Sequence, residues 1–117
     1  MSAFGSWSAG DNDVRLVAAR MPAGQFGMFL NAQASDLVYP PGSQGKLCLG
    51  GGAGRYGTQV VGGDGTFSLQ LNLTQTPIPG GSTAIQPGEV WFFQGWFRDQ
   101  NPSSTSNFTD GWVIPFQ

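Results

Sequence analysis

One segment, residues 66–74 (TFSLQLNLT), alternates apolar and polar side chains without interruption, and it constrains the fold more than any other feature. A period of two places Phe67, Leu69 and Leu71 on one face of an extended chain, with polar residues on the other. A helix would scatter the same leucines around its circumference. We therefore predict a strand over residues 66–74, with one face in a core and the other in water.

Similar but shorter patterns recur along the chain. Further strands are predicted at residues 14–20, 26–31, 46–49, 55–61, 90–98 and 112–116. Residues 1–12 form an N-terminal arm or edge strand. The turn residues Pro22 and Gly24 predict a hairpin between residues 14–20 and 26–31.

These patterns predict an all-β fold over residues 1–117, as a single domain. About seven to eight short strands and no helical period favour an antiparallel β-sandwich, jelly-roll or Ig-like, with a small barrel as the alternative. The 19 Gly and eight Pro fit tight turns between short strands. In the last strand, Pro115 predicts an edge that is unpaired or bulged.

Residues 90–98 are apolar on both faces. Trp91, Phe93 and Phe97 alternate with Phe92 and Trp96. A strand of this kind is usually central, so we expect a loop or a partner to cover its second face. The partner could be another copy of the chain.

Charge is scarce and slightly negative, which excludes several partners. Charged residues make up 10% of the chain, against about 25% in typical soluble domains. Five Lys and Arg with a net charge of −2 argue against nucleic acid, because phosphate neutralisation needs clustered cations. No apolar run approaches the roughly 20 residues of a spanning helix, so we expect no membrane insertion.

Catalytic residues are poorly represented. There is no His, the commonest general base at neutral pH. A glycosidase needs two carboxylates about 5 to 10 Å apart in a cleft, and the spacing singles out no such pair. We expect a protein that is not an enzyme, with an acid-base hydrolase as the least favoured alternative. The carboxylates are Asp11, Asp13, Asp36, Asp64, Glu89, Asp99 and Asp110.

Aromatic side chains are the best lead to a ligand site. Flat rings stack on the C–H faces of sugars, and we name Tyr39, Trp96 and Trp7 as candidate ligand-binding residues. A domain of this size also needs aromatic residues in its core, which is where we expect Trp91 and Trp112. Trp96 is evenly balanced between core and surface.

Two short acidic segments are candidates for structural Ca²⁺. Asp11 and Asp13, and likewise Asp99 and Asn101, place oxygen ligands at alternate positions. The stronger interpretation is capped turns, because Asp and Asn side chains bond to nearby backbone. Cys48 has no partner in the chain, so it is either a small buried apolar residue or bridged to another chain.

Two stretches are similar to a known family. Residues 89–99 (EVWFFQGWFRD) with residues 107–111 (NFTDG), and residues 21–29 (MPAGQFGMF), resemble an uncharacterised β-sandwich module. It occurs near the C-termini of large exported proteins of planctomycetes and other environmental bacteria. The likeness spans about residues 13–116. Gln100 and Asn101 intervene before Pro102, where the module often has Pro directly, and the module's second Cys is absent.

The resemblance implies a β-sandwich and an extracellular or cell-surface location, and it brings no activity. It also implies that Arg98, Asp99 and Asp110 form a structural ion pair between the last two strands. The N-terminus lacks a basic region followed by an apolar stretch, so we expect an export signal or upstream region to lie outside this chain.

These inferences favour a non-catalytic exported or cell-surface module for adhesion, envelope assembly or self-association. Its partners would be further copies of itself or other envelope proteins. A carbohydrate-binding module with exposed aromatic residues is the alternative, and its partner would be a glycan.

Overall fold

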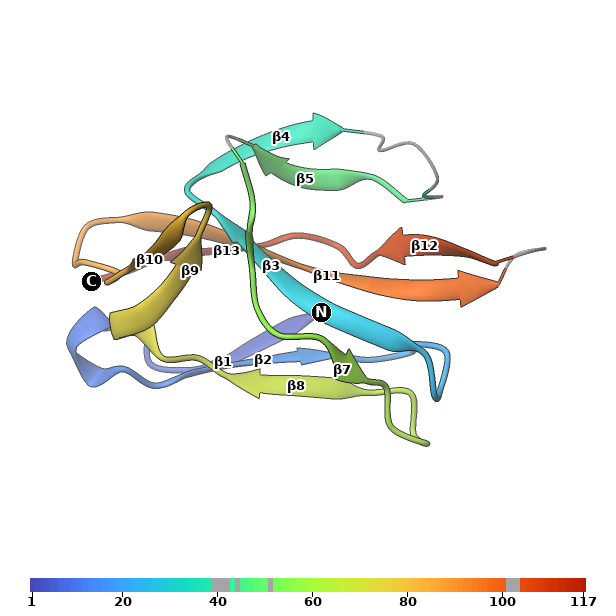
Figure 1. Cartoon of the computed structure of the whole chain (residues 1–117). Helices are drawn as coiled ribbons and strands as arrows, with labels where there is room; N and C mark the ends of the chain where they lie inside the picture. Colours follow the sequence, from blue (N-terminus) through green and yellow to red (C-terminus); the bar gives the residue numbers. More distant parts are fainter. Residues whose placement is uncertain (39–42, 44, 51, 101–103) are drawn as a thin grey trace.

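A computed structural model describes residues 1–38, 43, 45–50, 52–100 and 104–117 (Figure 1). The chain is all-β, as predicted, and its only helices there are two 3₁₀ turns, η1 (Ala9–Asp11) and η2 (Leu73–Gln75). The strands are β1 (Ser2–Gly5), β2 (Val14–Ala18), β3 (Phe26–Ala32), β4 (Ala34–Val38), β5 (Leu47–Gly50), β6 (Gly54–Arg55), β7 (Gln59–Val60), β8 (Phe67–Gln70), β9 (Thr76–Ile78), β10 (Gly81–Thr83), β11 (Val90–Gln100), β12 (Ser104–Phe108) and β13 (Trp112–Pro115).

The strands form antiparallel sheets stacked as a sandwich. One layer is β1-β2-β8, and the other is β12-β11-β3-β6, in which β13 also pairs with β11 and β7 with β3. The described strands close no barrel. β1 lies at the edge of its sheet, as expected for the N-terminal arm. Among the described residues no helix is long and apolar enough to cross a membrane.

The main core lies between these two layers. Val14, Leu16 and Ala18 of β2 are fully buried, as their alternation predicts. Facing them from the large sheet, Phe29 packs against Phe67 with ring centroids 4.7 Å apart. A Cβ atom on Gly27 would lie 2.7 Å from the Phe67 ring. The large sheet therefore has a glycine at this position because the neighbouring phenylalanine fills the space.

The predicted hairpin between residues 14–20 and 26–31 is wrong. β2 pairs with β1 and β8, whereas β3 pairs with β11, β6 and β7, so residues 19–25 cross from one layer to the other. The turn itself forms, with Gly24 at φ +79°. Core packing explains the crossing. Phe29 of β3 belongs to the same buried cluster as the apolar side chains of β2, so β3 lies across the core from β2 and not beside it in one sheet.

The alternating segment is a strand only as far as Gln70. Phe67, Leu71 and Leu73 are nonetheless buried, and Leu69 is half-buried against the main core, so the predicted face turns inward past the end of β8. Asn72 ends the extended conformation, because its side-chain oxygen accepts a hydrogen bond from Thr74 N at 3.1 Å and caps η2.

A third layer covers part of the large sheet. The β4–β5 hairpin lies over the face turned away from β8, which we call the outer face (Figure 1). Between the hairpin and the sheet, Leu49 of β5 forms a second apolar cluster with Leu30 and Ala32 of β3, against which Phe92 and Trp96 pack. The predicted cover over the second face of residues 90–98 is thus confirmed in part. The chain itself supplies it, and Phe92 and Trp96 stay half-buried. Among the described strands β13, with Pro115, pairs only with β11, as expected for an edge.

Candidate functional site

A groove on the outer face is the best candidate for a functional site. It has a volume of about 420 Å³ and opens between the β4–β5 hairpin and the large sheet. We call it the Trp96 groove, and its lining residues are Met28, Leu30, Leu47, Ala53, Arg55, Trp96 and Phe108. Ligand pockets of this size are usually apolar, with a few placed polar groups.

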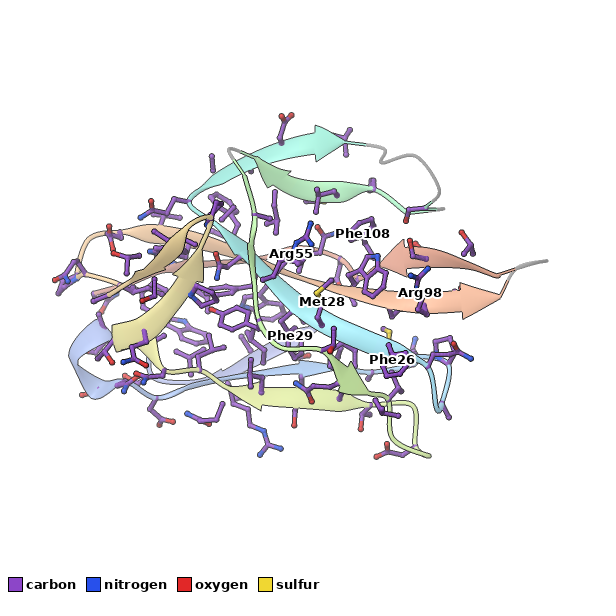
Figure 2. All side chains as sticks on the ribbon, viewed as in Figure 1. Phe26, Met28, Phe29, Arg55, Arg98 and Phe108 are labelled. Carbon is purple, nitrogen blue, oxygen red and sulfur yellow. The ribbon has the colours of Figure 1, made fainter. Side chains whose placement is uncertain are left out.

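Three neighbouring strands build the floor of the groove. Trp96 on β11 pairs with Met28 on β3 and with Phe108 on β12, so the three side chains form one row across the sheet. Figure 2 shows Met28 and Phe29, adjacent on β3, on opposite sides of the strand. Phe29 enters the main core, which leaves Met28 for the groove. All three floor residues are half-buried and keep part of their surface available.

Two arginines border this apolar floor. The guanidinium carbon of Arg98 lies 5.2 Å from the centre of the Trp96 ring, within range of a cation–π contact. Arg55, opposite Leu30 on β6, lines the groove directly. Both are exposed, and within the described part of the chain neither forms an ion pair. The groove is therefore a local positive site in a chain with a net charge of −2.

The wall of the groove is held by a buried amide. Gln94 is fully buried, and its Oε1 accepts a hydrogen bond from Cys48 N at 2.8 Å. Its Nε2 donates to Lys46 O at 3.0 Å and Thr109 O at 2.6 Å. These bonds fix β5, and with it Leu47, over the sheet. Sequence reasoning missed Gln94, although a lone amide within an apolar strand was an available signal.

The structure does not gather the predicted ligand-binding residues. Trp96 lines the groove, but Trp7 packs against the main core between the two layers. The two rings therefore lie on different surfaces. Tyr39 lies outside the described residues. Trp91 is buried in the main core, and Trp112 is half-buried against it, in agreement with their predicted role.

The expected ion pair between Arg98 and Asp110 is not formed. Asp110 instead accepts the Met1 ammonium at 2.7 Å. The β11–β12 register explains the difference, because Arg98 lies opposite Ser106, which precedes Asp110 by four residues. At about 3.3 Å per residue this separation is roughly 13 Å. Asp99 lies opposite Thr105 in the same ladder.

The acidic turn after β1 is tied together by hydrogen bonds. Asp11 Oδ2 accepts from Ser6 Oγ at 2.6 Å, and Asp13 Oδ1 from Gln70 Nε2 at 3.2 Å. Between them, Asn12 Oδ1 accepts from Leu73 N at 2.7 Å. None of these three bonds caps its own turn by a bond to nearby backbone. Asn12 and Asp13 instead tie the turn to the end of β8 and the residues after it.

The two predicted calcium segments lie far apart. Figure 1 places η1, which contains Asp11, at one end of the molecule and the end of β11, which contains Asp99, at the other. Asn101 lies outside the described residues. Across the part of the chain that the structure describes, no three His, Cys, Asp or Glu side chains are grouped to hold a metal ion. Calcium binding stays a prediction.

A buried polar pair lies on the other side of β3. Asn31 Nδ2 donates to Pro77 O at 3.0 Å, which ties β3 to β9. Asn31 Oδ1 and the Tyr56 hydroxyl are both buried, and neither makes a hydrogen bond of good geometry with a described residue. Burial raises the pKa of Tyr56 to about 12, and the nearby Asn31 side chain offsets part of that rise.

Comparison with protein-family models, curated proteins and solved structures finds no match for this chain. Its function must therefore be argued from the groove itself.

Proposed function

We propose that the chain is a non-catalytic adhesion module of an exported or cell-surface protein, and that it attaches to an anionic polymer through the Trp96 groove. The observation that carries the proposal is the pair of exposed arginines, Arg55 and Arg98, beside an apolar floor. Such a surface offers contact area and charge without reactive groups.

Binding suits this site better than catalysis. The chain has no His, and no carboxylate is among the residues that line the groove. General acid-base chemistry needs a titratable side chain within hydrogen-bond reach of the substrate. Of the lining residues only Arg55 is charged, and arginine is not among the usual general acids and bases.

The arginines favour a negatively charged ligand. A guanidinium recognises carboxylate or phosphate through two parallel N–H donors along one edge of its plane. These donors stay available when the face of the guanidinium packs on an aromatic ring. Arg98 lies over Trp96, with its guanidinium carbon 5.2 Å from the centre of the ring. An exposed acidic ligand group would give each arginine the counter-charge that it lacks within the described residues.

Retention on immobilised polyanions tests the proposal. Polygalacturonate and poly-L-glutamate columns should each retard the protein, and added salt should elute it because exposed charges are screened. Replacing Arg55 and Arg98 together by Ala should lower affinity about tenfold or more, since charged hydrogen bonds contribute about 1.5 to 3 kcal/mol. Arg15→Ala is the matched control, because Arg15 is exposed on the opposite layer. Failure of both columns to retain the protein would overturn the proposal, as would equal losses from control and test variants.

Self-association is a second candidate, favoured by a different observation. Phe26 and Val60 face each other across β3 and β7, and they are 57% and 59% exposed. An apolar cross-strand pair of this kind beside a groove extends the exposed apolar surface that marks an interaction site. The face could therefore bind a second copy of the chain.

A further inference from the structure

We infer that the polymer is a glycan whose repeating unit carries a carboxylate, a uronate-type polysaccharide. The inference rests on the proposed function and narrows its ligand class. Three features of the groove carry it: its ring-lined floor, the paired backbone of its two central strands, and the separation of its two arginines.

The floor offers rings of the kind that sugars stack on. Trp96 and Phe108 are direct neighbours across β11 and β12, and both are half-buried. The C–H face of a pyranose is flat and apolar, so it can lie on such a surface while its polar groups point away. Met28 extends the same row and widens the apolar strip.

The two central strands of the floor offer no free edge to an extended peptide. A peptide that binds by strand addition needs an unpaired edge. β3 pairs with β11 on one side and with β6 and β7 on the other, while β11 pairs with β3, β12 and β13. β12 and β6 are the edges of this sheet, so strand addition is restricted to the margins of the groove. Over the central floor, recognition therefore falls to side chains, which suits a sugar better than a peptide strand.

The arginines are spaced for two anionic groups. Arg55 lies beside Leu30, and Leu30 beside Gln94, four residues along β11 from Arg98. With strands about 4.8 Å apart and residues about 3.3 Å apart, the two Cα atoms are separated by roughly 16 Å. Figure 2 shows Arg55 and Arg98 on either side of Met28. This arrangement favours two carboxylates carried by one polymer chain.

A neutral sugar would use the site poorly. Arg98 already covers part of Trp96, so a neutral ring would have to compete with the guanidinium for the same surface. A carboxylated sugar can stack on the remaining aromatic surface and pair with the guanidinium edge, so both contacts are kept. The aromatic floor and the charge then act on the same ligand.

Isothermal titration calorimetry with three probes tests the inference. The probes are oligogalacturonate, poly-L-glutamate of matched charge, and a neutral oligoglucan, all at the same salt concentration. We expect oligogalacturonate to bind about tenfold more tightly than poly-L-glutamate, because the rings add to the charge contacts. The oligoglucan should bind more weakly than oligogalacturonate by a similar factor.

Two variants locate the preference. Trp96→Leu should reduce the difference between oligogalacturonate and poly-L-glutamate to within about twofold. Trp96→Phe keeps a ring and should retain most of the preference, and an unchanged thermal transition shows that each variant is folded. A preference that survives Trp96→Leu in a folded protein would contradict the inference.

The outcomes separate the two proposals. Equal binding of both polyanions would overturn the glycan inference and leave the adhesion proposal standing. Binding of neither polyanion would overturn both. If the neutral oligoglucan bound as tightly as oligogalacturonate, the carboxylate requirement would be wrong.

Discussion

The Gln94 side chain holds the backbone of Cys48, accepting its N–H at 2.8 Å from within the large sheet. The same amide donates to Lys46 O, on the other side of Leu47. One buried side chain therefore docks the β4–β5 hairpin onto β11. The groove depends on this docking, because Leu47 forms part of its wall.

Replacing Gln94 by Leu should destabilise the protein strongly. The change leaves the Cys48 N–H and the Lys46 and Thr109 carbonyls, which are part-buried, without their partner. A polar group that is left unsatisfied in a protein interior costs about 1 to 3 kcal/mol. We expect the free energy of unfolding in urea to fall by about 3 kcal/mol. Gln70→Leu, at an exposed position on β8, should change it by less than about 1 kcal/mol. Equal losses in the two variants would argue against the docking role.

Adding a methyl group at Gly27 should overpack the main core. The new Cβ would lie 2.7 Å from the Phe67 ring and 3.2 Å from Trp96 O. We expect Gly27→Ala to cost about 1 to 3 kcal/mol of stability by urea denaturation. Gly57→Ala is the control, because a Cβ atom there meets nothing within 4 Å.

A double-mutant cycle locates the cause. If the Phe67 ring is what the methyl group meets, Gly27→Ala should cost less in a Phe67→Leu background than in the native one. Strict additivity of the two changes would show that the strain lies elsewhere.

Stability should fall at high pH because of Tyr56. Its pKa is raised from 10.0 to about 12 in the folded protein. Below pH 10 both states keep the phenol proton, so Tyr56 adds no pH dependence. Between pH 10 and 12 the unfolded state loses the proton and the folded state keeps it, so stability decreases by up to about 2 to 3 kcal/mol.

The Tyr56→Phe variant isolates that contribution. The difference in unfolding free energy between the native protein and Tyr56→Phe should be constant below pH 10. Above pH 10 the unfolding free energy of the native protein should fall relative to that of Tyr56→Phe. A difference that does not vary up to pH 12 would mean that Tyr56 is not shielded from solvent as its burial indicates.

The Phe26–Val60 surface should mediate self-association if the second candidate function holds. Sedimentation velocity at about 100 µM should then show a species larger than the monomer, which Phe26→Ser weakens. Phe4→Ser is a matched control, because Phe4 is 58% exposed on β1, in the other layer. If the protein is monomeric at all concentrations, or if both variants have equal effects, the Phe26–Val60 surface does not mediate self-association.

The sequence predicted the layers better than their connections. Alternation in β2 and β8 identified which side chains enter the main core, because side-chain burial follows a local period. The turn at Pro22 and Gly24 reverses the chain, but turn residues do not determine whether the next strand lies beside its predecessor or across the core. The end of β8 depends on the single Asn72 cap.

The groove was only partly predictable. Trp96 stood out because it is opposite in phase to Trp91, on a strand with rings on both faces. Its partners Met28, Phe108 and Arg55 come from three other strands, and only their register brings them together. Register between distant strands leaves little trace in a single sequence, so neither the groove nor the role of Gln94 was expected.

The most direct test of the account is to observe the tryptophan indoles during binding. The chain has four Trp residues, so a ¹H–¹⁵N NMR spectrum should contain four indole N–H signals that single Trp→Phe variants assign. Titration with oligogalacturonate should shift the Trp96 signal and leave those of Trp7, Trp91 and Trp112, which pack in or against the main core, in place. Shifts at Trp7 or Trp112 with Trp96 unmoved, or no shift at all, would contradict the proposal that the Trp96 groove is the binding site.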